Sequence, residues 1–174
     1  MIKVGITGGI GVGKTYICNI LKKMGYSIFS SDQVSKKIVS ENTFVRDQIR
    51  KFFGEDIIVN EKISREKLAD QVFSNKEKLK KLNKIVHPFV KKEFDNWISN
   101  RYDEKVVFKE AAILFEANSH KNLDYVVCVT AKLQERINRV MQRDKVDGES
   151  VEKRISLQMS QIEKEKLSDF VIFN

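Results

Sequence analysis

The segment Gly8-Gly9-Ile10-Gly11-Val12-Gly13-Lys14-Thr15 constrains this chain more than any other. It has the spacing of a phosphate-binding loop, in which two fixed glycines precede a lysine and a hydroxyl residue. Before it, the β-branched residues Ile2, Val4 and Ile6 predict a buried strand. After it, apolar residues recur at helical spacing until Gly25. The motif therefore has both the preceding strand and the following helix that a phosphate-binding loop requires.

Each part of this loop has an expected role in binding ATP. The glycines allow successive N–H groups to point into one concavity, and the positive end of the following helix adds to the field on a bound phosphate. Lys14 is expected to act as an exposed point charge on the β- and γ-phosphates. Thr15 is expected to offer its hydroxyl to Mg²⁺. The alternative is a glycine-rich turn that binds no ligand.

The composition limits which partners and which cellular compartment are expected for this protein. The chain has 174 residues, a net charge of +8 and an isoelectric point near 9.4. This charge favours anionic partners, but the chain lacks a basic stripe interleaved with aromatic residues, so no nucleic-acid partner is expected. Cys18 and Cys128 are predicted to be buried thiols in a reducing compartment. Because no signal segment or membrane-length apolar run is evident, we expect a cytoplasmic protein without a membrane partner.

The order of the predicted elements indicates an α/β fold. Apolar runs at residues 2–6, 26–29, 105–108, 125–129 and 170–173 predict strands, and helical patterns lie between them. This alternation predicts a three-layer phosphate-loop fold around a parallel sheet of about five strands. Residues 111–115 either prolong the third strand or form a short helical turn. Thr130 is expected to cap the helix that follows.

We expect a single kinase domain with two added parts. The core comprises residues 1–40 and 105–174, and residues 41–104 form a helical insert. In this insert, Ser74 and Glu77 have the spacing of a capping box. The pair His87-Pro88 is predicted to break or kink a helix and to expose the imidazole.

Three charged residues are candidates for catalysis in addition to Lys14. Asp32 follows the second predicted strand, on the same rim of the sheet as the loop, where it could act as a base toward an incoming hydroxyl. Its alternative role is that of a helix N-cap. Arg139 and Arg143 lie four residues apart on one helical face. Arg143 borders the polar stretch Asp144 to Ser150, and residues 139–154 are expected to form a lid that closes over the γ-phosphate. The alternative for these arginines is a set of surface charges.

An ordered set of further motifs resembles the dephospho-coenzyme A kinase family from end to end. The opening Gly-Ile-Thr-Gly-Gly-Ile-Gly-Val-Gly-Lys-Thr is similar to that family's loop, and Asp32 falls on the second aspartate of its Asp-Ala-Asp segment. The remaining matches are His87-Pro88, Ile113-Leu114-Phe115-Glu116, Arg139, Arg143-Asp144, Arg154, Gln158, Lys164 and the closing run Ser168 to Asn174. The chain departs from the family at Ser30, Lys91, Ala112 and Arg136, where aspartate, arginine, proline and glutamine are common.

This resemblance implies a kinase that transfers the γ-phosphoryl group of ATP to the ribose 3′-hydroxyl of dephospho-coenzyme A. It implies Asp32 as the general base and His87, Lys91 and Glu116 as contacts to the acceptor. We expect a monomer or a weak homo-oligomer. Family members usually continue past the final asparagine, so adenine contacts from that region are not assigned.

Two alternatives to this activity remain. One is a phosphate-loop kinase for another nucleoside or nucleotide acceptor. The other is a nucleotide switch or a nucleic-acid-binding ATPase, although the chain lacks an Asn-Lys-x-Asp guanine signature.

Overall fold

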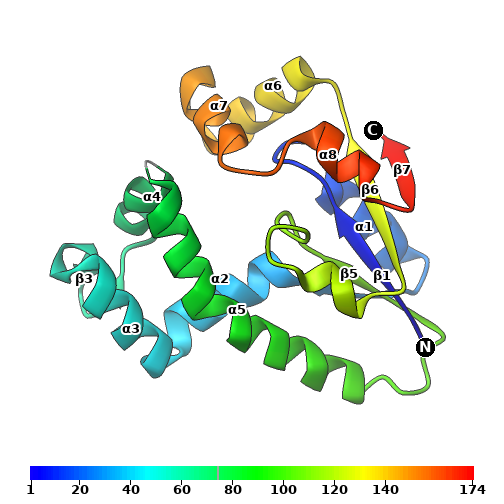
Figure 1. The fold of residues 1–174 in the computed structure, drawn as a ribbon, viewed down its shortest axis with the longest axis horizontal. Helices are drawn as coiled ribbons and strands as arrows, with labels where there is room; N and C mark the ends of the chain where they lie inside the picture. Colours follow the sequence, from blue (N-terminus) through cyan, green and yellow to red (C-terminus); the bar gives the residue numbers. More distant parts are fainter. Residues whose placement is uncertain (74) are drawn as a thin grey trace. The chain divides into compact units, whose positions relative to one another are not determined.

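Strand β1 (Ile2–Thr7) lies at the centre of a five-stranded parallel sheet, in the order β2-β5-β1-β6-β7. The other strands are β2 (Ser27–Ser30), β5 (Val106–Glu110), β6 (Tyr125–Thr130) and β7 (Phe170–Phe173). The computed structural model describes residues 1–73 and 75–174 (Figure 1). Because every strand runs in the same direction, their carboxyl ends share one edge. The predicted α/β fold with a parallel sheet is confirmed.

The chain forms two compact units. The first comprises Met1–Ser31 and Ile98–Asn174, and the second comprises Asp32–Trp97. Besides the sheet, the first unit contains the helices α1 (Lys14–Lys23), η2 (Ser119–Asn122), α6 (Leu133–Asp144), α7 (Gly148–Ser156) and α8 (Gln161–Lys166). The phosphate-loop motif and the two candidate arginines therefore belong to one unit.

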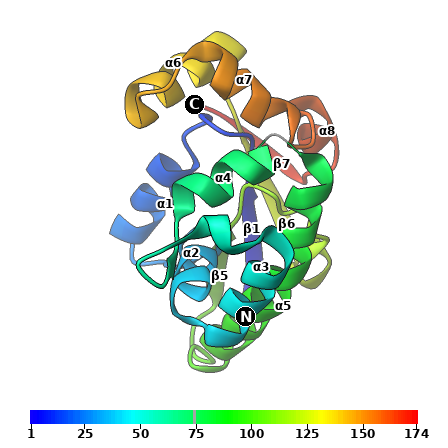
Figure 2. The same ribbon diagram turned by 90° about the vertical axis from the view of Figure 1, so that its left-hand side faces the viewer.

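Both faces of the sheet are covered in the first unit, because neighbouring residues of a strand point to opposite faces. Ile6 packs with Val12 and Cys18 on the α1 face. On the other face, Gly5 leaves room for Leu114 and Leu123. Figure 2 shows α1 and α8 on opposite sides of the strands. The apolar core thus holds β1, and with it the start of the loop, from both sides.

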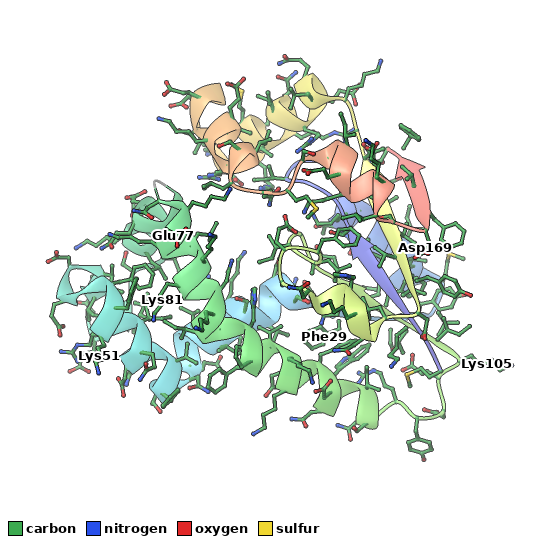
Figure 3. The ribbon with its side chains drawn as sticks, in the orientation of Figure 1. Phe29, Lys51, Glu77, Lys81, Lys105 and Asp169 are labelled. Carbon is green, nitrogen blue, oxygen red and sulfur yellow. The ribbon has the colours of Figure 1, made fainter. Side chains whose placement is uncertain are left out.

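The edge strand β7 is anchored by Asp169, which is labelled in Figure 3. The Asp169 N–H donates to the carbonyl of Val126 at 2.9 Å, and its carboxylate accepts from the Val126 N–H at 2.7 Å. At the other end of β7, the Asn174 N–H donates to the Thr130 carbonyl at 2.9 Å. These bonds bring Asn174 to the carboxyl edge of the sheet, where the loop also lies.

The second unit is mainly helical, as predicted for the insert. It contains α2 (Ser31–Glu41, whose first residue belongs to the first unit), α3 (Thr43–Phe53), η1 (Glu55–Ile57), α4 (Arg65–Phe73) and most of α5 (Lys76–Ser99). Strands β3 (Ile58–Val59) and β4 (Lys62–Ile63) form a short antiparallel hairpin. Its turn residues Asn60 and Glu61 both have positive φ, which suits a two-residue hairpin loop. The return strand β4 gave no signal in the sequence because it is only two residues long.

The break expected at His87 is wrong. Helix α5 continues through Pro88, and His87 is half-buried rather than exposed. A proline costs a helix one N–H donor, but Val86, Val90 and Phe94 are buried on both sides of it, and their packing favours the continuous helix. Ser74, and with it the proposed capping box, lies outside the described residues.

Three local expectations are corrected in the first unit. Helix α6 has Lys132 at its N-cap, without a side-chain bond, so Thr130 is not the cap and ends β6 instead. Residues 112–118 form turns after β5, which excludes one long strand. Helix α6 ends at Asp144 and α7 begins at Gly148, with Asp147 as its N-cap, so only residues 145–147 of the polar stretch 144–150 lie outside a helix. Across the described parts of the chain, no helix has the length and apolar character needed to span a membrane.

Gly5→Val is expected to destabilise the fold by about 1–3 kcal/mol, because overpacking forces neighbours from their preferred positions. A Cβ at Gly5 would lie 2.8 Å from both Leu114 Cδ2 and Leu123 Cδ1. Urea unfolding measures the change. Gly148→Ala is the control, since its Cβ would meet only Met141 Sδ at 3.7 Å and Ile137 Cγ2 at 3.9 Å. Equal stabilities for the two variants would contradict this packing.

Candidate functional site

The glycines of the loop occupy positions where a side chain would not fit. Gly8 and Gly13 have φ values of 141° and 90°, in the region that favours glycine. A Cβ at Gly8 would lie 2.2 Å from the carbonyl oxygen of Val129, and one at Gly13 would lie 2.1 Å from Asn174 Nδ2. The loop is therefore enclosed by β6 and by the end of β7, which forces its backbone into a tight curve before α1.

Lys14 is folded back over this curve. Its Nζ donates to the carbonyls of Gly8 at 2.9 Å and Gly9 at 3.3 Å, and its side chain is buried. The expectation of an exposed lysine is therefore wrong, because the carbonyls of the loop hold the ammonium against the backbone. The first N–H groups of α1 have no partner within the helix and carry its partial positive charge. Together with the Lys14 ammonium, they make the loop a binding site for anions.

Three side chains hold the loop by its backbone. Gln161 Oε1 accepts from the Gly9 N–H at 2.9 Å, and Gln158 Oε1 accepts from the Ile10 N–H at 3.0 Å. Arg136 Nε donates to the Ile10 carbonyl at 3.0 Å. Gln158 matches the family in sequence and Arg136 departs from it, but no sequence pattern predicted that either residue contacts the loop. Gln161 was not among the predicted residues. All three come from the segment that runs from α6 to α8.

Arg139 lies beside the last glycine of the loop. A Cβ at Gly13 would be 3.7 Å from Arg139 Nη1, and Arg139 Nη2 donates to the carbonyl oxygen of Asn174 at 3.4 Å. The Asn174 side chain in turn donates to the Val12 carbonyl at 2.9 Å. Arg139 therefore lies beside the loop, and its role toward the transferring group stays a prediction. Asn174, which the sequence matched only as the end of the closing run, is an additional contact to the loop.

Arg143, one turn further along α6, is bound by an aspartate. Its Nε and Nη2 donate to Asp144 Oδ1 at 2.7 Å and Oδ2 at 3.0 Å, and Arg154 Nη1 donates to Asp144 Oδ2 at 2.9 Å. Hydrogen bonding from Arg143 and the two positive charges keep the pKa of Asp144 below its usual value. Asp144 thus holds two guanidinium groups together, and its own single charge leaves this group with a net positive charge.

The carboxyl edge also holds a buried carboxylate beside β2. Ser30 lies opposite Glu110 in the register of the sheet, and its hydroxyl donates to Glu110 Oε2 at 2.7 Å. Burial, and to a lesser degree the charge of Glu110, raises the pKa of the Cys18 thiol to about 12. In the described residues, the buried hydroxyls of Thr7 and Ser31 have no hydrogen-bond partner. This edge is therefore polar, as a site that receives a polar ligand should be.

Glu116, a predicted acceptor contact, has partners within the first unit. Its Oε1 lies 2.8 Å from Lys164 Nζ and accepts from the Met159 N–H at 2.9 Å. Lys164 is completely buried and also donates to the Ala112 carbonyl. Both residues belong to the sequence matches, and their ion pair joins α8 to the turns after β5. Binding of the acceptor by Glu116 stays a prediction.

The remaining candidates belong to the second unit. Asp32 lies in the first turn of α2 and is half-buried, so it is inside the helix and is not its N-cap. Lys91 is exposed on α5 and pairs with Asp95 at 2.7 Å. His87 lies one turn before Lys91 on the same helix. Asp32 lies in the first turn of α2, where an acidic side chain interacts favourably with the helix dipole.

Comparison with known proteins agrees with this geometry. The profile of the dephospho-CoA kinase family matches residues 2–174. A dephospho-CoA kinase of Bacteroides fragilis is 36% identical over 173 residues, which cover 99% of this chain and 84% of that protein. Among solved structures, a protein of Thermus thermophilus is 33% identical with a TM-score of 0.86, covering 99% of this chain and 88% of its own. The dephospho-CoA kinase of Campylobacter jejuni is 29% identical with a TM-score of 0.69, covering 99% of this chain and 87% of its own. The chain belongs to the dephospho-CoA kinase family.

Proposed function

We propose that this protein transfers the γ-phosphoryl group of ATP to the ribose 3′-hydroxyl of dephospho-coenzyme A, giving coenzyme A and ADP. The observation that carries the proposal is the loop itself, in which Lys14 Nζ is held by the carbonyls of Gly8 and Gly9 at the start of α1. Membership of the family supplies the acceptor. Phosphoryl transfer depends mostly on positioning and on neutralising charge, and this loop does both.

The loop from Gly8 to Thr15 cradles the phosphates of ATP, and Lys14 neutralises charge on the β- and γ-oxygens. Thr15 is exposed in the first turn of α1, where its hydroxyl fits a Mg²⁺ ion that takes its other oxygen ligands from phosphates and water. In the described residues no group of three His, Cys, Asp or Glu side chains could hold a metal by itself, which suits an ion that arrives with the nucleotide. Bound there, Mg²⁺ supplies positive charge to the transferring group.

Arg139 and Arg143 supply further positive charge. Arg139 already lies beside Gly13, and Arg143 projects from the same face of α6 one turn later. The Arg143 side chain is 61% exposed, so it can exchange Asp144 for a phosphate oxygen at little cost in burial. A cation that meets the phosphoryl group during transfer stabilises charge that develops in the transition state.

Asp32 orients the acceptor hydroxyl and accepts its proton. A carboxylate can take this role, and β2 ends two residues before Asp32 at the carboxyl edge. His87, Lys91 and Glu116 contact the acceptor in this scheme. Lys91 would exchange Asp95 for a phosphate of dephospho-coenzyme A, which is possible because both partners are exposed.

The acceptor is tested by ADP release with dephospho-coenzyme A, with simple nucleosides and with nucleoside monophosphates. We expect turnover only with dephospho-coenzyme A. Lys14→Met keeps most of the side chain's apolar stem and should lower kcat about a hundredfold to a thousandfold, the usual loss for one preorganised cation or donor. Circular dichroism checks that the variant folds. Faster turnover with a nucleoside would assign the loop to another kinase activity.

Arg143→Ala is expected to lower kcat by about tenfold to a hundredfold while the Kd for ATP changes by less than about threefold. The reason is that this arginine acts on charge present mainly in the transition state. Single-turnover rates and nucleotide titrations separate the two effects. Lys153→Ala is the control, because Lys153 is exposed on α7 and pairs only with its neighbour Glu149 among the ion pairs described for this chain. A rise in KM alone would make Arg143 a contact of the ground state.

Asp32→Asn is expected to fold and bind ATP but to transfer phosphate about a hundredfold more slowly, toward the lower end of general-base effects because the transition state is loose. Loss of one charge near the start of α2 should cost only about 0.3–1 kcal/mol of stability. Melting temperature and single-turnover rate are measured together. Glu41→Gln removes an equal charge at the other end of α2 as the control. A wild-type rate in Asp32→Asn would exclude the base role.

A further inference from the structure

Arg136 is a buried arginine placed against the phosphate loop. Only 5% of the residue is exposed, although arginine is rarely buried without a compensating charge. Its Nε donates to the Ile10 carbonyl, and its Nη2 packs so closely on the loop that a Cβ at Gly9 would lie 2.3 Å away. The main chain of Arg136 contacts the loop as well, because a Cβ at Gly11 would lie 2.4 Å from its carbonyl oxygen. The guanidinium is therefore fixed in position by the loop and by α6.

The charge of this guanidinium is poorly balanced. Arginine carries five N–H donors and stays ionised in proteins. None of the ion pairs found in residues 1–73 and 75–174 includes Arg136. The charge of Glu165 acts on Arg136, but this carboxylate accepts a hydrogen bond from Gln161 at 3.3 Å. Burial lowers the pKa of Arg136, which is the sign of a charge that its surroundings do not fully compensate.

Two cations thus flank one residue of the loop. Lys14 Nζ lies on the carbonyl of Gly9, and Arg136 Nη2 lies against its Cα. A buried charge costs free energy unless an opposite charge compensates it. The polyphosphate of a nucleotide brings several negative charges to the same loop, so nucleotide binding would supply the missing compensation.

We propose that Arg136 is a second fixed cation of the nucleotide site, which holds the Gly9–Ile10 segment in place and strengthens nucleotide binding through its charge. The proposal rests on the proposed function only in that the loop binds a nucleotide, and it does not depend on the acceptor. Arg136 acts through the loop and through space, so it is a positioning residue rather than a catalytic one. In the nucleotide-free protein, the buried and under-compensated charge of Arg136 lowers the free energy of unfolding.

Removal of the Arg136 charge is therefore expected to have opposite effects on the stability of the free protein and on its affinity for nucleotide. Arg136→Gln removes the charge and keeps an amide that can donate toward Ile10. The free variant should melt at the same temperature as the wild type or higher, because an under-compensated buried charge has been removed. Binding of MgADP should weaken by about tenfold, and the rise in melting temperature caused by MgADP should shrink. Arg136→Lys, which keeps the charge, should recover most of the affinity.

The experiment is calorimetric titration of MgADP at several NaCl concentrations, with melting temperatures measured with and without nucleotide. Wild-type affinity should fall more steeply with salt than that of Arg136→Gln, since the variant has one charge fewer near the phosphates. Lys23→Gln is the control: it removes the same charge at the far end of α1, about 14 Å from the loop, beyond the Debye length at physiological salt. It should bind MgADP as the wild type does.

Two results would overturn the proposal. One is a wild-type affinity and salt dependence in Arg136→Gln, which would leave the charge without a role in binding. The other is a free Arg136→Gln protein that melts lower or fails to fold, which would make Arg136 a structural residue of the loop. A wild type that binds MgADP but does not phosphorylate dephospho-coenzyme A would refute the proposed function and leave the test of Arg136 intact.

Discussion

The backbone of Gly9 and Ile10 is the constraint on which the first unit depends. Gln161 and Gln158 accept hydrogen bonds from the N–H groups of Gly9 and Ile10, and Arg136 donates to the carbonyl of Ile10. The ammonium of Lys14 donates to the carbonyls of Gly8 and Gly9. A glycine-rich loop has high conformational entropy when free, so a rigid anion site needs such bonds from outside the loop. The segment from α6 to α8 supplies them, with Arg136 on α6, Gln158 between α7 and α8, and Gln161 at the start of α8.

The same arrangement joins the segment proposed as a lid, residues 139–154, to the loop. Ile10 packs with Ile137, Val140 and Val151, so α6 and α7 share a small apolar core with the phosphate site. Arg139 and Arg143 project from the helix that this core holds. One helix therefore carries both arginines, and their ion-pair partners Glu135 and Asp144 are exposed and half-buried, respectively.

Ion pairs serve two different purposes in this unit. The pair between Glu116 and Lys164 joins α8 to the turns after β5. Because Lys164 is completely buried while the Glu116 side chain is 23% exposed, removing the glutamate would leave an uncompensated buried charge. The group formed by Arg143, Asp144 and Arg154 lies nearer the surface and is only moderately stabilising. Arg136 differs from both, since it is buried and takes part in no ion pair within the described part of the chain. The charges in the two ion-paired groups therefore stabilise the fold, whereas the charge of Arg136 is the one proposed to act on a bound nucleotide.

Local patterns in the sequence predicted the loop, the parallel α/β fold and the mainly helical character of the region between the second and third strands of the sheet, because motif spacing and apolar periodicity are set by neighbours along the chain. The family followed from the resemblance of an ordered set of motifs. The same local reasoning failed at Pro88, where packing on both sides keeps α5 continuous, and at Lys14, which the loop carbonyls bury. Only the tertiary structure brought Arg136, Gln158, Gln161 and Asn174 onto the loop. These contacts join residues 126 to 162 positions apart, and no local pattern encodes a hydrogen bond made across such a distance along the chain.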